Sequence, residues 1–182
     1  MKKLIFCCSL AIFLFACNSN EPKTKGMNTD STDNTVAAKP MVDLPYTASY
    51  SSKWSADVSD ADLKTVLMSY KDWENNNISG LANAMADTIE VDVSSGEHFK
   101  KSNADLMKMW STYRDSLSSV KIKVDAWQKM YSTDKKDGYI VVWYDETDTY
   151  KNGKVDSASY HDINQVKDGK IIWYSQYKRP KK

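Results

Sequence analysis

Residues 157–177 read SASYHDINQVKDGKIIWYSQY, and this stretch predicts two β-strands joined at Asp168-Gly169. An Asp-Gly pair between two strand-like segments is a strong signal of a tight β-hairpin. Its first strand holds His161, one of two histidines in a chain of 182 residues. The stretch therefore predicts an antiparallel sheet at this end of the chain, and it raises the question of what a histidine does there.

The preceding residues extend the same pattern toward the N-terminus. From Ser119, apolar residues such as Val120 and Ile122 alternate with lysines, which is the period of a half-buried strand. Residues 139–147 are apolar on both faces at first, and turns are expected near Asp137-Gly138 and Asn152-Gly153. We therefore expect a run of long antiparallel strands over residues 119–177.

The segment before the sheet has the period of helices. Ser59, with Asp62 three residues later, is a good helix start, and apolar residues follow at helical spacing as far as Trp73. A short second helix, a strand over residues 87–93, a loop over 94–101 and a third helix that begins at Ser102 come next. Helices followed by strands predict an α+β fold, with the helices packed on one face of a curled antiparallel sheet.

In this order of elements, the chain resembles the NTF2-like superfamily and its SnoaL-like branch. Two motifs carry the resemblance, WENNNISGLANAMADTIEV at residues 73–91 and YHDINQVKDGKIIWY at residues 160–174. The resemblance covers residues 55–178. It implies a cone, in which a curved antiparallel sheet wraps around the N-terminal helices and leaves a pocket at the open end. Because this fold carries isomerases, cyclases, dehydratases, epoxide hydrolases and non-catalytic binders, it does not by itself define a function.

Comparison with the ketosteroid isomerases of this superfamily implies candidate site residues. Tyr70 falls at the position of their oxyanion-binding tyrosine, and Val93 falls at the position of their catalytic base, with Asp92 one residue earlier. His161 falls at the position of their second, protonated acid. The resemblance thus implies that His161 points into the cone, where it would hold a ligand or act as an acid or base near neutral pH.

Three functions remain open on these residues. The first is a non-catalytic binder of a small, largely apolar molecule, and the second is a cyclase, dehydratase or isomerase that uses His161 with Tyr70 or Asp92. The third is a dimeric interaction module, with Trp127, Tyr131 and Tyr160 on the outer face of the sheet. For a binder, the expected ligand-contacting residues are Tyr70, Trp73, Trp110, Tyr113, Trp143 and His161.

The first 17 residues, MKKLIFCCSLAIFLFAC, indicate where the protein is exported. Two lysines precede an apolar run that is shorter than the roughly 20 residues of a membrane-spanning helix, so it is typical of a signal peptide. Its last four residues resemble a bacterial lipobox, which implies that Cys17 is lipidated and becomes the first residue of the mature protein. We therefore expect a lipoprotein of the bacterial cell envelope, on the periplasmic face of a membrane or at the cell surface.

Composition narrows the remaining choices. Residues 18–53 are polar and read as a flexible tether, residues 54–178 as the NTF2-like domain, and residues 179–182 as a basic tail. All three cysteines lie in the first 17 residues, so we expect no disulfide, no metal site and no cofactor in the domain. A net charge of +1 provides no basic field for nucleic acid. The expected partners are a small molecule, a membrane through the lipid, and a second copy of the chain.

Overall fold

The computed structural model describes residues 42–181, and the folded unit begins at Leu44. The predicted signal peptide, the predicted lipidation site Cys17 and the predicted tether as far as residue 41 lie outside the described residues. Within residues 42–181, no helix combines the length and the apolar character that a membrane crossing would require.

Three helices precede the long strands, and the capping residues that the sequence indicated begin two of them. The helices are α1 (Asp60–Glu74), α2 (Ile78–Ala84) and α3 (Asn103–Arg114). The Ser59 hydroxyl accepts a hydrogen bond from the backbone N–H of Asp62, and Ser102 caps α3 in the same way through Asp105. Each cap satisfies a backbone donor that the first turn of a helix leaves free.

Seven strands form one curved sheet. They are β1 (Trp54–Ser55), β2 (Met85–Asp92), β3 (His98–Ser102), β4 (Leu117–Ser132), β5 (Asp137–Tyr150), β6 (Val155–Lys167) and β7 (Lys170–Pro180). Their order in the sheet is β1-β4-β5-β6-β7-β2-β3, and all neighbours are antiparallel except β2 and β7. The β6–β7 turn has positive φ at both Asp168 and Gly169, as a type I′ hairpin turn requires.

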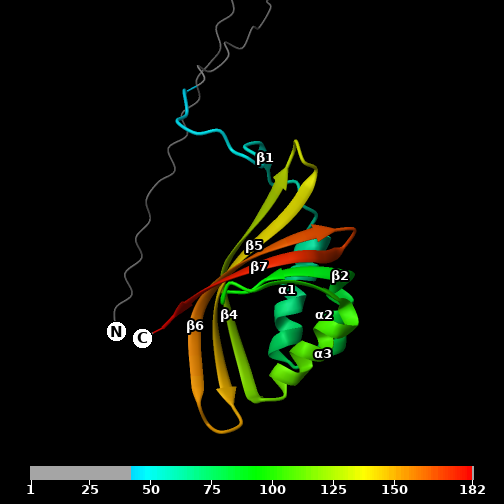
Figure 1. Ribbon diagram of the computed structural model, residues 1–182, viewed down its shortest axis with the longest axis vertical. Coiled ribbons are helices and arrows are strands. Elements are labelled where there is room, and N and C mark those ends of the chain that lie inside the picture. Colours follow the sequence, from blue (N-terminus) through cyan, green and yellow to red (C-terminus); the bar gives the residue numbers. More distant parts are fainter. Residues whose placement is uncertain (1–41, 182) are drawn as a thin grey trace, which may run out of the picture. The chain divides into compact units, whose positions relative to one another are not determined.

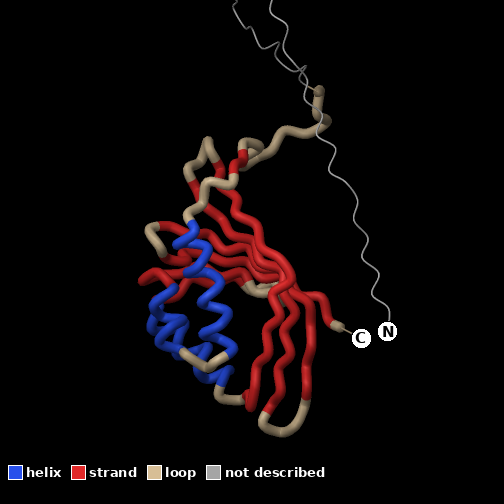
Figure 2. The backbone as a smooth tube through the Cα atoms, turned by 180° about the vertical axis from the view of Figure 1, so that it is seen from behind, coloured by secondary structure: helices blue, strands red, loops and turns tan. Residues whose placement is uncertain are grey.

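The sheet curves around the helices, which lie on its concave face (Figure 1). Seen from behind, α1, α2 and α3 fill the hollow of the sheet, and the turn between β5 and β6 extends beyond them (Figure 2). Irregular pairing in β2, β4 and the β6–β7 pair adds local bends. The most buried side chains, among them Ile89, Leu106, Ile140 and Ile171, lie between the two layers. The predicted α+β cone is therefore confirmed.

Two local predictions differ from the structure. Residues 94–101 were expected to be a loop, but His98–Ser102 form the edge strand β3, because they pair with Thr88–Asp92 of β2. The turn expected at Asp137-Gly138 lies before these residues, which open β5 opposite Ser132 and Tyr131. In both cases pairing with a neighbouring strand decided the backbone, and a single segment does not display its partner.

The ordered contacts of the domain extend beyond the predicted limits at both ends. Tyr50, assigned to the tether, donates a hydrogen bond to Asp137, and the Lys53 carbonyl accepts one from the Thr133 amide. At the other end, Arg179 pairs with Ser159 inside β7, and Lys181 forms an ion pair with Asp145. Most of the predicted basic tail is thus part of the sheet edge, while Lys182 lies outside the described residues.

Candidate ligand-binding cavity

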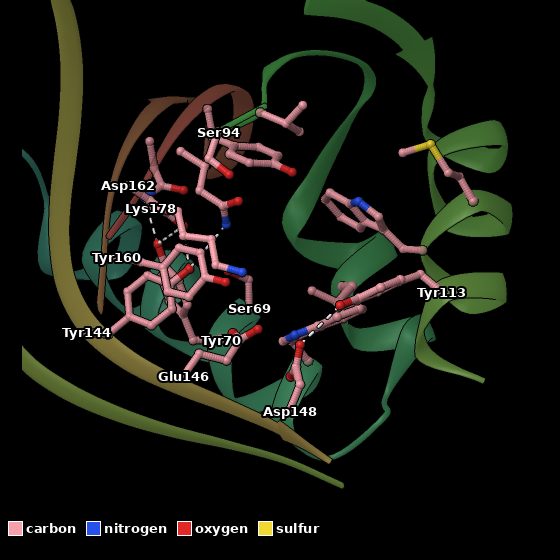
Figure 3. A pocket seen from close by; sticks show the side chains of 18 of the residues that line it. Ser69, Tyr70, Ser94, Tyr113, Tyr144, Glu146, Asp148, Tyr160, Asp162 and Lys178 are labelled. Carbon is pink, nitrogen blue, oxygen red and sulfur yellow. Dashed lines mark hydrogen bonds between the residues drawn. The ribbon is translucent and has the colours of Figure 1, made fainter. Parts of the chain in front are cut away.

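A cavity of about 520 Å³ lies between the helices and the concave face of the sheet. Its size is within the range of small-molecule sites in proteins. Figure 3 shows side chains from the helices facing side chains from the sheet across this space. The lining includes seven aromatic residues, Tyr70, Trp73, Trp110, Tyr113, Tyr144, Tyr160 and Tyr174.

A buried carboxyl group, Asp162, lies at one end of the cavity. The hydroxyl groups of Tyr70 and Tyr144 both donate to its Oδ2 atom, at 3.1 and 3.0 Å. Asn164 donates in turn to the Tyr70 hydroxyl at 3.1 Å and to the Ile140 carbonyl at 3.2 Å. This network holds the Tyr70 hydroxyl in place, since that oxygen donates once and accepts once.

The environment of Asp162 favours its protonated form. Burial raises the pKa of this carboxyl to about 7, and the hydrogen bonds from Tyr144 and Tyr70 oppose only part of that rise. Its second oxygen, Oδ1, has no hydrogen-bond partner in the protein although it is buried. A carboxyl group that changes its charge near neutral pH therefore keeps one buried oxygen unpaired at the wall of the cavity.

A second pair of carboxyl groups, Glu146 and Asp148, lies along the same wall. Burial and then the charges of Asp148 and Asp162 raise the pKa of Glu146 to about 8, and burial also raises the pKa of Asp148. The Tyr113 hydroxyl donates to Asp148 Oδ2 at 3.1 Å, and Asp148 Oδ1 is buried without a partner. Two adjacent buried carboxyl groups favour a shared proton, because both cannot ionise at low cost.

One positive charge, that of Lys178, lies at the same cavity, and its ammonium group is already paired. Its Nζ atom lies 3.0 Å from Asp156 Oδ2 and 5.6 Å from the centre of the Tyr160 ring. Desolvation lowers the pKa of Lys178, but the hydrogen bonds with Asp156 and Tyr160 more than reverse this, so the net shift is upward. Lys178 therefore stays charged and balances Asp156.

Four of the six predicted ligand-contacting residues line the cavity. They are Tyr70 and Trp73 from α1 and Trp110 and Tyr113 from α3. The Trp73 and Tyr113 rings are stacked, with an interplanar angle of 2° and centres 6.1 Å apart. Trp143 does not line it, because its side chain lies on the outer face of β5 and is 38% exposed.

The expected orientation of His161 was wrong. Tyr160, Asp162 and Asn164 of β6 line the cavity, so His161 lies on the opposite face, where it stacks on Tyr177 at 4.6 Å. The residue beside Tyr70 is instead Asp162, which follows His161 in the chain. A shift of one residue exchanges the faces of a strand, and β6 carries polar and apolar residues on both faces, so the pattern did not reveal the difference.

Of the neighbouring residues Asp92 and Val93, only Val93 faces the cavity. Val93 lines the cavity, at the position where the resemblance implied a base, and it offers no titratable group. Asp92 is not a lining residue, since its Oδ1 lies 2.7 Å from Nδ1 of His98 and its Oδ2 accepts from the Trp173 indole at 2.9 Å. The proposed pairing of His161 with Tyr70 or Asp92 therefore does not occur around this cavity.

The three residues expected on the outer face of the sheet do not lie there. Tyr160 lines the cavity, Tyr131 packs against the core, and Trp127 pairs with the core residue Val142 and shares its face. The outer face instead carries a row of cross-strand neighbours, Trp143, His161 and Tyr177. A homodimer stays a prediction.

Sequence reasoning missed the acidic groups of the cavity, Glu146, Asp148 and Asp162. Residues 145–156 are rich in charged residues and resemble an exposed hairpin tip, but the alternation that buries Ile140, Val142 and Tyr144 continues to Glu146 and Asp148. This continued alternation along the strand was the feature of the sequence that could have placed Glu146 and Asp148 on the cavity wall. Within residues 42–181, no cluster of three or more histidine, cysteine, aspartate or glutamate side chains is arranged to hold a metal ion.

Comparison with known proteins identifies the fold. No protein-family model and no curated protein matches this sequence. Among solved structures, similarity extends to an LEH-like epoxide hydrolase from M. tuberculosis (TM-score 0.57, 8% identity, 66% of this chain and 84% of that one). It also extends to a protein named as a SnoaL-like polyketide cyclase from Jannaschia sp. CCS1 (0.55, 10%, 67% and 88%). A third is an NTF2-like protein of unknown function from Burkholderia pseudomallei (0.53, 14%, 67% and 92%). The folded part of this chain therefore has the NTF2-like fold that SnoaL-like proteins share.

Proposed function

We propose that this domain binds a small, largely apolar molecule in the cavity between its helices and its sheet. The observation that carries the proposal is the cavity itself, about 520 Å³ lined by seven aromatic side chains with its polar groups grouped along one wall. Aromatic walls with a few placed polar groups are typical of sites that hold and orient a small ligand. The fold supports the binding of a small molecule in general, because it is shared by binders and by enzymes that act on small molecules.

We also propose that the domain is held at a membrane of the cell envelope through a lipid on Cys17. The signal-like residues 1–17 support this, as does the polar composition of residues 18–41. About 30 polar residues span on the order of 30 Å as a flexible chain, which would let the domain reach ligands away from the membrane surface.

The binding proposal is tested by what the protein carries when it is purified from its own cells. We expect the full-length protein to release a reproducible small molecule on denaturation, measured by mass spectrometry of the extract. Trp110→Ala removes one aromatic wall and is expected to lower that amount at least about tenfold, because a buried aromatic contact contributes roughly 1.5–3 kcal/mol. Trp127→Ala is the matched control, since Trp127 is 52% exposed and does not line the cavity. Equal recovery from both variants, or an empty wild-type protein, would contradict the proposal.

A second candidate is an enzyme that uses Asp162 as a general acid or base. The observation in its favour is the free Oδ1 atom of a buried carboxyl whose pKa is about 7. The Asp-Arg-Asp arrangement of epoxide hydrolases with this fold is not supported, because Arg114 binds the backbone carbonyls of Trp73 and Glu74 and does not line the cavity.

The two candidates give different results with Asp162→Asn. If the co-purified molecule is converted by the wild-type protein, the variant is expected to lose about 100-fold or more in kcat while still binding that molecule. If the domain is a binder, product is absent with both proteins, and following the molecule over time by mass spectrometry decides between them. Tyr160→Phe, which keeps the aromatic wall, serves as the control for an indirect effect of changing the wall.

A further inference from the structure

The buried polar atoms of the cavity that lack a hydrogen-bond partner are all carboxylate oxygens. Among the side chains of residues 42–181, the two buried polar atoms without a hydrogen-bond partner are Asp148 Oδ1 and Asp162 Oδ1. Both are carboxylate oxygens, and both residues line the same cavity. Since a buried polar group without a partner costs free energy, two such groups in one cavity indicate the complement that a ligand should bring. That complement is a hydrogen-bond donor.

The hydroxyl donors next to these oxygens are already in use. Tyr113 donates to the other oxygen of Asp148, while Tyr70 and Tyr144 both donate to the other oxygen of Asp162. The carboxyl group beside Asp148 is that of Glu146, which is itself an acceptor unless it holds a proton. Rotation of these hydroxyl groups therefore cannot satisfy the free oxygens without breaking an existing hydrogen bond, and the donor within reach of Asp148 is the proton that it shares with Glu146.

The acidic side chains that line the cavity outnumber the basic ones. Glu146, Asp148 and Asp162 line it together with Lys178, and Lys178 is paired with Asp156. Within residues 42–181 these three carboxyl groups form no ion pair, so those of them that ionise oppose the entry of an anion. An additional acid, Glu97, lies in the exposed loop that contributes to the lining.

The aromatic walls suit the same kind of ligand. The stacked rings of Trp73 and Tyr113 lie beside the Glu146–Asp148 pair, and Figure 3 shows Tyr70, Glu146 and Asp148 along one side of the cavity. Aromatic faces attract cations electrostatically and pack against apolar groups. A cation held by carboxylates here would therefore have aromatic surfaces around its apolar part.

We propose that the ligand of this cavity is a primary amine in its ammonium form, with its charged group at the Glu146–Asp148 pair and its apolar body against the aromatic walls. The inference rests on the proposed binding function and specifies the chemical class of the ligand. An ammonium group has three N–H donors, so it can satisfy Asp148 Oδ1 and still bind Glu146. Its charge also makes these hydrogen bonds stronger than those of a neutral hydroxyl.

Without a bound amine, the Glu146–Asp148 pair holds a proton instead of the ammonium group. Burial raises the pKa of Glu146 to about 8, so at pH 7 the pair retains a proton that an incoming ammonium group would displace. The other ionisable groups that face the pair are Tyr70 from α1, Tyr113 from α3, Tyr144 from β5, Asp156, Tyr160 and Asp162 from β6, and Lys178 from β7. Binding of the amine is therefore coupled to release of a proton, and the affinity rises with pH between about 6 and 8.

Three probes of equal size test the proposal, 4-phenylbutylamine, 4-phenylbutan-1-ol and 4-phenylbutanoate, measured by calorimetry on the full-length protein at pH 7. We expect the amine to bind at least about tenfold more tightly than the alcohol, and the acid to bind more weakly than both. Calorimetry in two buffers of different ionisation enthalpy is expected to give between about 0.5 and 1 proton released per amine bound. The combined Glu146→Gln and Asp148→Asn variant keeps the shape of the pair and is expected to remove both the preference for the amine and most of the proton release.

Asp145→Asn is the matched control, because Asp145 directly precedes Glu146 in the chain, lies on the opposite face of β5 and pairs with Lys181. It is expected to retain the preference for the amine. Equal affinities for amine and alcohol would overturn the ammonium inference while leaving the binding function intact. Failure of the amine to bind at millimolar concentration would overturn the inference whatever the other probes do. A preference that survives in the double variant would place the charged group elsewhere and would also overturn it.

Discussion

Replacing Asp162 with asparagine is expected to reduce the loss of stability that the wild-type domain shows as the pH rises from 5 to 8. The pKa of Asp162 is about 7 in the folded protein, against an ordinary value of 3.8. Between these values the folded state holds a proton that the unfolded state has lost. The unfolded state therefore binds fewer protons, and the free energy of unfolding falls as the pH rises, until the folded group also ionises near pH 7.

The size of the effect follows from the same shift. Each pKa unit corresponds to 1.36 kcal/mol, so the wild-type protein is expected to lose about 3 kcal/mol through this group between pH 5 and pH 8. Asparagine keeps the shape and one oxygen for the Tyr70 and Tyr144 hydroxyls, and it has no charge to desolvate. Urea unfolding at pH 5 and pH 8 measures the difference, which should be smaller in the variant by about that amount.

The control for this experiment is Asp145→Asn. The hydrogen bond from Lys181 and then that from Ser159 lower the pKa of Asp145, so this carboxyl stays ionised at both pH values. Its removal should leave the difference between pH 5 and pH 8 as it is in the wild-type protein. If Asp162→Asn has the same pH dependence as the wild type, then Asp162 is not the buried acid that the structure indicates. Glu146 is present in both proteins, but the charge of Asp162 helps to raise its pKa, so its own contribution to the pH dependence also decreases in Asp162→Asn and adds to the measured difference.

Replacing Arg114 with methionine is expected to destabilise the domain by about 3 kcal/mol. This buried side chain donates from Nε to the Trp73 carbonyl and from Nη2 to the Glu74 carbonyl, both at 3.2 Å. These carbonyl groups end α1, where a helix leaves its last acceptors without partners. Methionine retains the apolar stem but loses both of these charge-assisted hydrogen bonds, each worth roughly 1.5–3 kcal/mol. The Trp73 carbonyl keeps a hydrogen bond from the Asn76 amide, so the Glu74 carbonyl is the acceptor left unsatisfied.

The chain contains a matched control for this change. Arg179 is the other arginine, it is exposed on β7, and Arg179→Met is expected to change the free energy of unfolding by less than about 0.5 kcal/mol. Urea unfolding of the three proteins at one pH provides the comparison. Since Arg114 holds the end of α1, and with it Trp73, the methionine variant should also bind the cavity ligand more weakly. Similar stabilities for both variants would show that the α1 carbonyls find other partners.

The helix starts and the tight hairpin turn could be predicted, because each of them depends on residues that are close together in the sequence. Ser59 and Ser102 are recognisable helix starts since each reaches a backbone N–H three residues on, and Asp168-Gly169 specifies a tight turn through its own dihedral angles. The aromatic residues of α1 and α3 were also predictable, because helical spacing places them on one face.

The acidic wall of the cavity could not be predicted in the same way. On β6, Asp162 and His161 are adjacent, polar, and equally compatible with either face, so alternation alone does not choose between them. On β5, Glu146 and Asp148 resemble solvent-exposed residues near a hairpin turn. Their burial depends on the curvature of the sheet and on the helices that cover its concave face.

The sequence by itself determined the helix starts, the hairpin turns, the α+β class and the resemblance to NTF2-like proteins, because each of these depends on residues close together in the chain. The tertiary structure decided which face of each long strand turns inward, and thus that Asp162 rather than His161 faces Tyr70. It also decided that Glu146, Asp148 and Asp162 line one cavity. The physical reason is that strand register and burial are set by partners far away in the sequence, and the pKa of a carboxyl group depends on that burial.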